Sequence, residues 1–320
     1  MKVAIIQIIE RNGKMSYKKQ EYYEVQGTSY KLPITTIEGG RADKTFLISA
    51  GVHGCEYVGI EALKQWAREV NPSQVNGKII CLHLANPNAF SQRVPELVPE
   101  DGKNLNRVFP GKEDGTAAER LAAAITKDFQ LKADYFVDLH GGDLHESVTP
   151  LAYFAGVAEE KIVEKSREMA QVLCVPLRVR SGAMTGAYNS AARLGVPSIL
   201  IERGGRGHWS QEEVDAYKQD IVTLLTYFGF LKSAQDKKLL VNEEQIEITK
   251  ATYLNAPIAG WWYPQVNAGD FVDIGDILGT ICDDFGECLL TLEAKDTGTI
   301  LYMTRTLALK KGEALIAQST

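Results

Sequence analysis

The chain predicts a three-layer α/β fold, a mixed β-sheet with helices on both faces, followed by a small C-terminal all-β barrel or sandwich. From about residue 31 to residue 229, short apolar runs alternate with longer amphipathic segments. That pattern is typical of a mainly parallel or mixed sheet covered on both sides. Beyond residue 235 the helical periodicity ends and short strands punctuated by glycine follow, which favours a small sandwich or barrel.

The elements of the first region follow in order from their periodicity. Strands are expected over residues 45–52, 78–85, 133–139 and 196–201, and helices over residues 57–70, 117–131, 159–173 and 211–228. A polar stretch at residues 233–238 marks the expected boundary, so we predict domains over residues 1–235 and 236–320. In the second domain, residues 283–287 predict a hairpin turn.

Composition narrows the class of protein. The net charge of −6 does not favour nucleic acid or an anionic membrane as a partner. The five cysteines form no CxxC pair, so reduced thiols in a cytoplasmic protein are expected. The first ten residues predict a strand rather than a signal peptide, and no apolar run reaches the ~20 residues of a membrane helix. This composition is compatible with a homo-oligomer.

Two histidines and a glutamate form the main candidate site. His53 and Glu56 follow the apolar run at residues 45–50, and His140 follows another at residues 135–139. Two imidazoles and one carboxylate leave zinc an open position at which it can activate water. A lone HxxE pair arises often by chance, but strand ends of such sheets gather at one edge. We therefore predict one zinc ion per chain, held by these three residues.

Glu202 ends a further apolar strand, where a carboxylate is costly unless it is paired or used. Beside a metal-activated water it would act as the general base. The alternative is a salt bridge to Arg203 or Arg206.

A loop bounded by proline and glycine carries the remaining candidates. Arg107, beside Asn106, is suited to grip a carboxylate, and Arg93 to stabilise an oxyanion. In the alternative interpretation, Asn104 and Asn106 cap turns and the arginines are solvated.

In their order along the chain, these motifs resemble the succinylglutamate desuccinylase/aspartoacylase branch of the zinc carboxypeptidase-like superfamily. The motifs are Gly51–Glu56, Asn86–Phe90 with Arg93, Asp101–Gly111, Asp138–Gly142 and Glu202–Gly205. The resemblance implies a carboxypeptidase-like sheet and a C-terminal domain similar to a biotinyl/lipoyl-type barrel.

For the site, the resemblance implies that His53, Glu56 and His140 bind zinc and that Glu202 is the general base. It also implies that Arg93 lies on the oxyanion side, and that Asn106 and Arg107 clamp a carboxylate. Arg193 lies near the position of a further substrate arginine of aspartoacylases without aligning to it, and the C-terminal tyrosine of those enzymes has no assignable counterpart.

The expected function is removal of an acyl group from an N-acylated amino acid or a similar small amide. A metallocarboxypeptidase acting on short peptides would need the same ligands and clamp. A different class, a carrier of covalent biotin or lipoate, would use Lys295, although no surrounding Met-Lys-Met pattern exists. A pseudoenzyme that keeps zinc structurally would not need a general base and a clamp.

Overall fold

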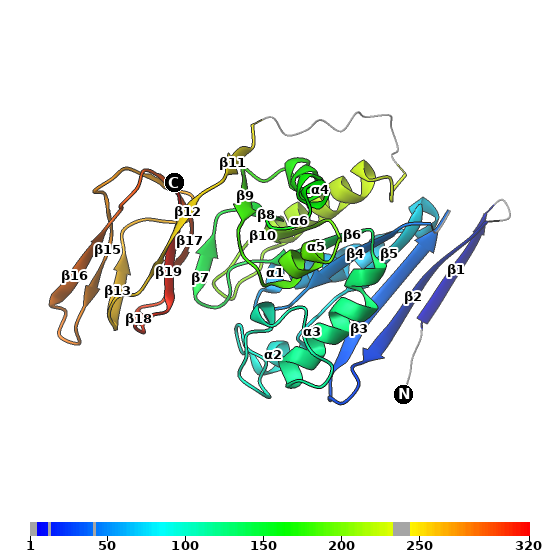
Figure 1. Ribbon diagram of the computed structural model, residues 1–320, viewed down its shortest axis with the longest axis horizontal. Coiled ribbons are helices and arrows are strands. Elements are labelled where there is room, and N and C mark those ends of the chain that lie inside the picture. Colours follow the sequence, from blue (N-terminus) through cyan, green and yellow to red (C-terminus); the bar gives the residue numbers. More distant parts are fainter. Residues whose placement is uncertain (1–4, 12–13, 41–42, 233–243) are drawn as a thin grey trace.

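A ten-stranded sheet forms the largest part of the molecule. The computed structural model describes residues 5–11, 14–40, 43–232 and 244–320. The strand order is β1-β2-β3-β5-β4-β6-β10-β8-β9-β11 (Figure 1). The central pairs β5–β4, β4–β6 and β6–β10 are parallel, whereas β1, β2 and β3 form an antiparallel meander at one end. The strands are β1 (Ile5–Arg11), β2 (Lys14–Glu24), β3 (Lys31–Gly39), β4 (Thr45–Ala50), β5 (Gly77–Leu82), β6 (Tyr135–His140), β8 (Leu151–Ala155), β9 (Leu177–Ser181), β10 (Ser198–Glu202) and β11 (Ile246–Ile248).

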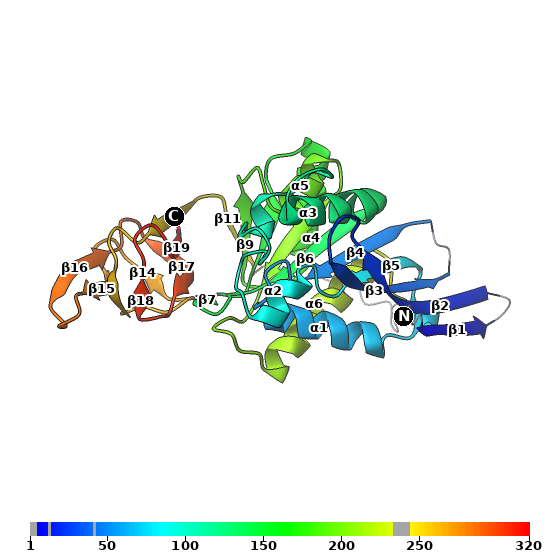
Figure 2. The same ribbon diagram turned by 90° about the horizontal axis from the view of Figure 1, so that it is seen from below.

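Helices cover both faces of this sheet, as the sequence predicts. Figure 2 shows α1 and α6 on one side and α3 and α5 on the other. Successive strand residues point to opposite faces, so Ile48 and Val137 pack in the core with α1 and α6. Leu47 and Phe136 pack in the core with α3 and α5. The helices are α1 (Tyr57–Glu69), α2 (Pro87–Gln92), α3 (Ala117–Asp128), α4 (Glu160–Gln171), α5 (Ala187–Arg193) and α6 (Gln211–Tyr227).

Capping side chains satisfy free backbone N–H groups at the starts of α2 and α6. Asn86 accepts from the N–H of Ala89 at 3.2 Å at the start of α2. Ser210 accepts from the N–H of Glu213 at 3.2 Å at the start of α6. The helix predicted over residues 117–131 ends earlier, at Asp128, and a short 3-10 turn over Gln130–Lys132 follows it.

Two small antiparallel sheets make up the C-terminal region, which confirms the expected all-β architecture. One has the order β12-β19-β17-β14 and the other β16-β15-β13-β18. The fully buried Trp262 lies in the apolar cluster of this region. The predicted turn joins β15 to β16, and there the N–H of Asp283 donates to the carbonyl of Glu287 at 3.0 Å. The strands are β12 (Ala251–Asn255), β13 (Gly260–Pro264), β14 (Phe271–Val272), β15 (Ile277–Cys282), β16 (Cys288–Glu293), β17 (Gly298–Thr304), β18 (Ala308–Leu309) and β19 (Ala314–Ser319).

Strands cross between the two regions. β11, which follows the expected boundary, pairs with β9 in the large sheet. Conversely β7 (Glu146–Val148), a segment between β6 and β8, pairs with β17 of the C-terminal region. The predicted division after residue 235 lies outside the described residues, so these exact domain limits stay a prediction.

No helix in the described part of the chain combines the length and apolar character needed to traverse a lipid bilayer.

Candidate metal and catalytic site

The candidate site lies where β4, β6 and β10 end side by side. His140 is the last residue of β6 and is in register with Glu202, the last residue of β10. His53 lies in the loop that follows β4, and Glu56 is the residue directly before α1. Because these strands are parallel, their carboxyl ends meet at one edge. The structure therefore brings together the four residues predicted from strand ends.

The loop that carries His53 and Glu56 packs directly against α2. A Cβ atom at Gly54 would lie 2.3 Å from the backbone nitrogen of Phe90, which real Cβ atoms essentially never do. Glycine at this position therefore allows the loop to approach α2 closely.

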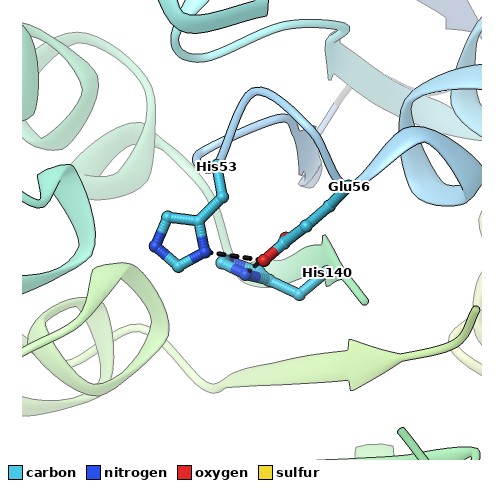
Figure 3. A group of neighbouring side chains, drawn as sticks. All are labelled: His53, Glu56 and His140. Atoms are coloured by element: carbon cyan, nitrogen blue, oxygen red, sulfur yellow. Dashed lines mark hydrogen bonds and ion pairs between the residues drawn. The ribbon is translucent and has the colours of Figure 1, made fainter. Parts of the chain in front are cut away.

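The His53, Glu56 and His140 side chains converge on one point (Figure 3). The Nδ1 atom of His53 lies 2.6 Å from Oε1 of Glu56, and the Nδ1 atom of His140 lies 2.9 Å from Oε2. One potential ligand atom from each residue lies within 4.8 Å of the others. All three residues are buried. This is the donor set predicted for zinc.

The charges of the triad are strongly coupled. Burial lowers the pKa of each histidine, but the Glu56 carboxylate outweighs that effect, so both pKa values are raised, that of His140 well above 6.5. Burial raises the pKa of Glu56, yet His140 and His53 bring it down to about 2. A buried carboxylate thus stays ionised because cationic partners face it.

The triad fits a divalent cation. Oε2 of Glu56 is buried and, despite its short distance to His140, has no partner in hydrogen-bond geometry. Each histidine presents Nδ1 to the carboxylate, and each uses its other ring nitrogen for a contact outside the triad. An arrangement in which one nitrogen faces the ion and the other is held by a neighbouring oxygen is usual for metal-binding histidines.

Those outer contacts are specific. Nε2 of His140 lies 2.9 Å from Oδ2 of Asp138, whose Oδ1 accepts from the hydroxyl of Ser49 at 2.5 Å. Nε2 of His53 lies 3.2 Å from Oδ1 of Asn104. Asp138 therefore lies where it can orient His140 as a ligand.

Glu202 forms no ion pair with a lysine or arginine in the described part of the chain. Its Oε2 atom is buried and has no hydrogen-bond partner among the described residues. Burial raises its pKa well above 4.5; His140 opposes this shift, but the Glu56, Glu146 and Asp138 carboxylates add to it. The alternative of a salt bridge to Arg203 or Arg206 is wrong, because neither arginine forms an ion pair with Glu202 and the Nε atom of Arg203 pairs with Oδ2 of Asp220 at 2.7 Å.

The predicted clamp and oxyanion residues are more dispersed. Asn106 is buried, and its Oδ1 accepts from the N–H of Ala187 at 2.9 Å, at the start of α5. Arg107 is exposed and has no ion-pair partner in the described chain. Arg93 is exposed at the left-handed end of α2, where φ is 55°. It lines a surface cavity of about 910 Å³ with Tyr57 and Trp209 rather than the metal triad.

Sequence reasoning missed two residues near the site. Tyr302, on β17, has its pKa raised by burial, by Glu146 and by Glu202, while Arg107 acts in the opposite direction. Burial raises the pKa of Glu146 on β7 to about 8, and neighbouring carboxylates add to this. Both reach the site through the β7–β17 pairing, which joins segments about 150 residues apart and has no local sequence signal.

Comparisons with known proteins agree with this geometry. Residues 42–228 match the model of the succinylglutamate desuccinylase/aspartoacylase catalytic domain, which is more than half of the 320 residues. The chain belongs to this family. The family resemblance inferred from the motifs is thereby confirmed.

Relatives within the family are deacylating hydrolases that act on amide bonds. A protein of Halomonas elongata named N-alpha-acetyl-L-2,4-diaminobutyric acid deacetylase is 26% identical over 258 residues, which cover 79% of this chain and 74% of that protein.

Solved structures of the family share the fold. The succinylglutamate desuccinylase/aspartoacylase of Rhodobacter sphaeroides superposes with a TM-score of 0.81 at 25% identity, covering 95% of this chain and 96% of that one. The product-bound ectoine utilization protein EutE (DoeB) of Ruegeria pomeroyi has a TM-score of 0.82 at 22% identity, covering 98% and 99%.

Lys295, the residue considered for a carrier function, is exposed in the connection between β16 and β17. These strands belong to different sheets, so the lysine is not at a hairpin tip.

Proposed function

We propose that the protein is a zinc-dependent deacylase that hydrolyses the amide bond of an N-acylated amino acid. One observation carries the proposal: a converging His-Glu-His triad lies beside Glu202, whose buried Oε2 atom has no hydrogen-bond partner and whose carboxyl pairs with no lysine or arginine among the described residues. Zinc, when bound by His53, Glu56 and His140, would supply Lewis acidity for water and for the scissile carbonyl.

Glu202 has the position and environment of a general base. It ends the strand next to the one that carries His140, in register with that ligand. In the proposed reaction it takes a proton from the attacking water and passes it to the leaving nitrogen. Its raised pKa favours holding the proton between these two steps, and a divalent cation in the triad would lower this pKa.

The other roles rest on the family resemblance and on position. Arg107 is proposed to bind the substrate carboxylate, with Asn106 holding the loop in place through its contact at the start of α5. Arg93 is proposed to act on the oxyanion side, which would require its exposed side chain to turn from the neighbouring cavity toward the substrate.

The relative from Halomonas suggests an N-acetylated diamino acid as one substrate to examine. The electrostatics near the triad support a cationic side chain. Asp143, Glu146 and Glu202 form no ion pair with a lysine or arginine in the described part of the chain, so an ammonium group on the substrate would lower the cost of burying them. A cytoplasmic location, where such metabolites occur, remains part of the proposal.

The test combines metal analysis with a substrate panel. The purified protein is assayed for zinc and then for hydrolysis of N-acetyl-L-2,4-diaminobutyrate, of N-acetylnorvaline as its neutral isostere, of N-acetylaspartate and of short peptides. Stoichiometric zinc with turnover of N-acetyl amino acids supports the proposal. Preferential release of C-terminal residues from peptides would replace it with the carboxypeptidase alternative. Added mass from biotin or lipoate, with no turnover, would point to the carrier.

A further inference from the structure

A tyrosine of α6 joins the ends of the two strands that carry the candidate ligand and base. The Tyr217 hydroxyl donates to the carbonyl of Ile201 at 2.7 Å and also to the carbonyl of His140. The side chain is fully buried in the core between α6 and the sheet. The first carbonyl belongs to the residue before Glu202, and the second to the metal-ligand candidate itself.

The next turn of the same helix holds the other side of Glu202. Asp220 is three residues after Tyr217, so both side chains lie on one face of α6. The Asp220 carboxylate pairs with Nε of Arg203 at 2.7 Å, and Arg203 directly follows Glu202. The Arg203 guanidinium also lies 5.9 Å from the centre of the Tyr217 ring. Helix α6 thus fixes the residues on both sides of the proposed base.

This arrangement matters because Glu202 and His140 act at a shared point. Small changes in the separation of reacting groups reduce rates strongly. The backbone N–H of Arg203 also donates to the carbonyl of His140, but at 3.4 Å, which is long for a hydrogen bond. A hydroxyl shared between the two carbonyls sets the distance between the strand ends directly.

We propose that Tyr217 is a positioning residue for both the metal ligand His140 and the base Glu202, and that Asp220 positions the base alone through Arg203. The inference rests on the proposed function for its catalytic part, whereas its effect on metal binding can be measured without any substrate.

The chain offers a matched control on the same helix. The Tyr227 hydroxyl donates to Oε1 of Glu168 at 3.0 Å, on the far end of α6 from the candidate site. Tyr227→Phe removes a hydrogen-bonded hydroxyl without touching either strand end. Comparing it with Tyr217→Phe separates loss of positioning from loss of a hydrogen bond in general.

The experiment uses the full-length protein in both variants and in Asp220→Asn. Zinc dissociation constants are measured on metal-free protein by competition with a chelating dye, and kcat and KM are measured on zinc-loaded protein with the best N-acetyl amino acid. For Tyr217→Phe we expect zinc to bind about 10-fold more weakly and kcat to fall roughly 10- to 100-fold at nearly constant KM. For Asp220→Asn we expect a fall in kcat of about 10-fold with unchanged zinc affinity.

Equal zinc constants and equal kcat in Tyr217→Phe and Tyr227→Phe would overturn the inference while leaving the proposed function intact. If no N-acetyl amino acid is hydrolysed but zinc still binds more weakly to Tyr217→Phe alone, the proposed function fails and the positioning of His140 stands. If Tyr217→Phe does not fold, Asp220→Asn decides the matter, since a normal kcat in that variant contradicts the role given to α6.

Discussion

Two carboxylates of the large sheet, Glu247 and Glu202, have opposite electrostatic environments. At the β9–β11 edge, Glu247 accepts from Nε of Arg178 at 2.7 Å and from Nε of Arg167 at 2.6 Å. Burial raises its pKa, but the two arginines outweigh this and lower it. At the carboxyl ends of the central strands β6 and β10, Glu202 has no arginine partner and its pKa is raised.

The difference shows where the protein supplies an arginine partner for a carboxylate and where it does not. A buried charge with its partner in the chain belongs to the fold. A buried carboxyl without one, next to a converging triad, indicates that the partner comes from outside, as a metal ion or a substrate group. The predictions that follow test this contrast from the strongest expected effect to the weakest.

Replacing Glu202 with Gln should give the largest change in catalysis. The substitution keeps the shape but removes the proton acceptor, so kcat should fall about 10³- to 10⁴-fold. Zinc content, measured by elemental analysis, should stay at one ion per chain. A near-normal rate would remove Glu202 as the base.

Replacing His53 or His140 with Ala should act on the metal first. Loss of one of three protein ligands should lower zinc affinity at least 100-fold, measured by chelator competition. Unchanged zinc stoichiometry in both variants would contradict the ligand assignment. Asp138→Asn, which only weakens the orientation of His140, should lower zinc affinity roughly 10- to 100-fold.

Zinc affinity should decrease as the pH falls. Both histidine pKa values are raised above 6.5 in the metal-free site, and zinc requires the unprotonated rings. Proton competition should therefore begin at a higher pH than for an ordinary histidine pair. Zinc titrations between pH 8 and pH 6 check this, and a constant affinity across that range would argue against the histidines as ligands.

Changing Arg107 to Ala should weaken substrates that carry a free carboxylate by roughly 10- to 100-fold in kcat/KM, since a bidentate contact is lost. Methyl esters of the same substrates should lose much less. Equal losses for acid and ester would show that Arg107 is not a carboxylate clamp.

At the β9–β11 edge of the sheet, Glu247→Gln should leave zinc affinity and kcat unchanged and lower the free energy of unfolding by about 2 kcal/mol. The lowered pKa of Glu247 determines how its contribution to stability changes with pH. Its contribution is present above the ordinary glutamate pKa and is lost as the pH falls through the folded value. Urea unfolding of both proteins at pH 7 and pH 4 should therefore show the difference shrinking in acid.

Much of the fold was predictable because the central strands and helices have strong periodicity. Residues 45–50 and 135–139 are short, mainly apolar runs that predict buried strands, and the helix at Tyr57–Glu69 follows its pattern to within one residue of the expected end. The three candidate metal ligands were predictable for the same reason, since each lies at the end of one of these strands or shortly after it.

The remaining site depends on contacts between distant segments. The sequence around Arg203 allowed a salt bridge to Glu202, and only the packing of α6 shows that Asp220 takes that arginine instead. Tyr302 and Glu146 have no motif, because β-strand pairing depends on backbone hydrogen bonds that any residue except proline can make. Asn106 was predicted as a clamp, and its contact with α5 emerges only from the fold.

The pairing of β7 with β17 has a practical consequence for protein engineering. The N–H of Arg305 donates to the carbonyl of His145 at 2.6 Å, and that of Thr149 to the carbonyl of Leu301 at 2.8 Å. The segment that follows His140 in the chain is therefore hydrogen-bonded to β17, in the last third of the polypeptide. A chimaera that exchanges the C-terminal sheets between relatives would therefore also change the segment beside the candidate metal site, although that region supplies none of the three candidate ligands.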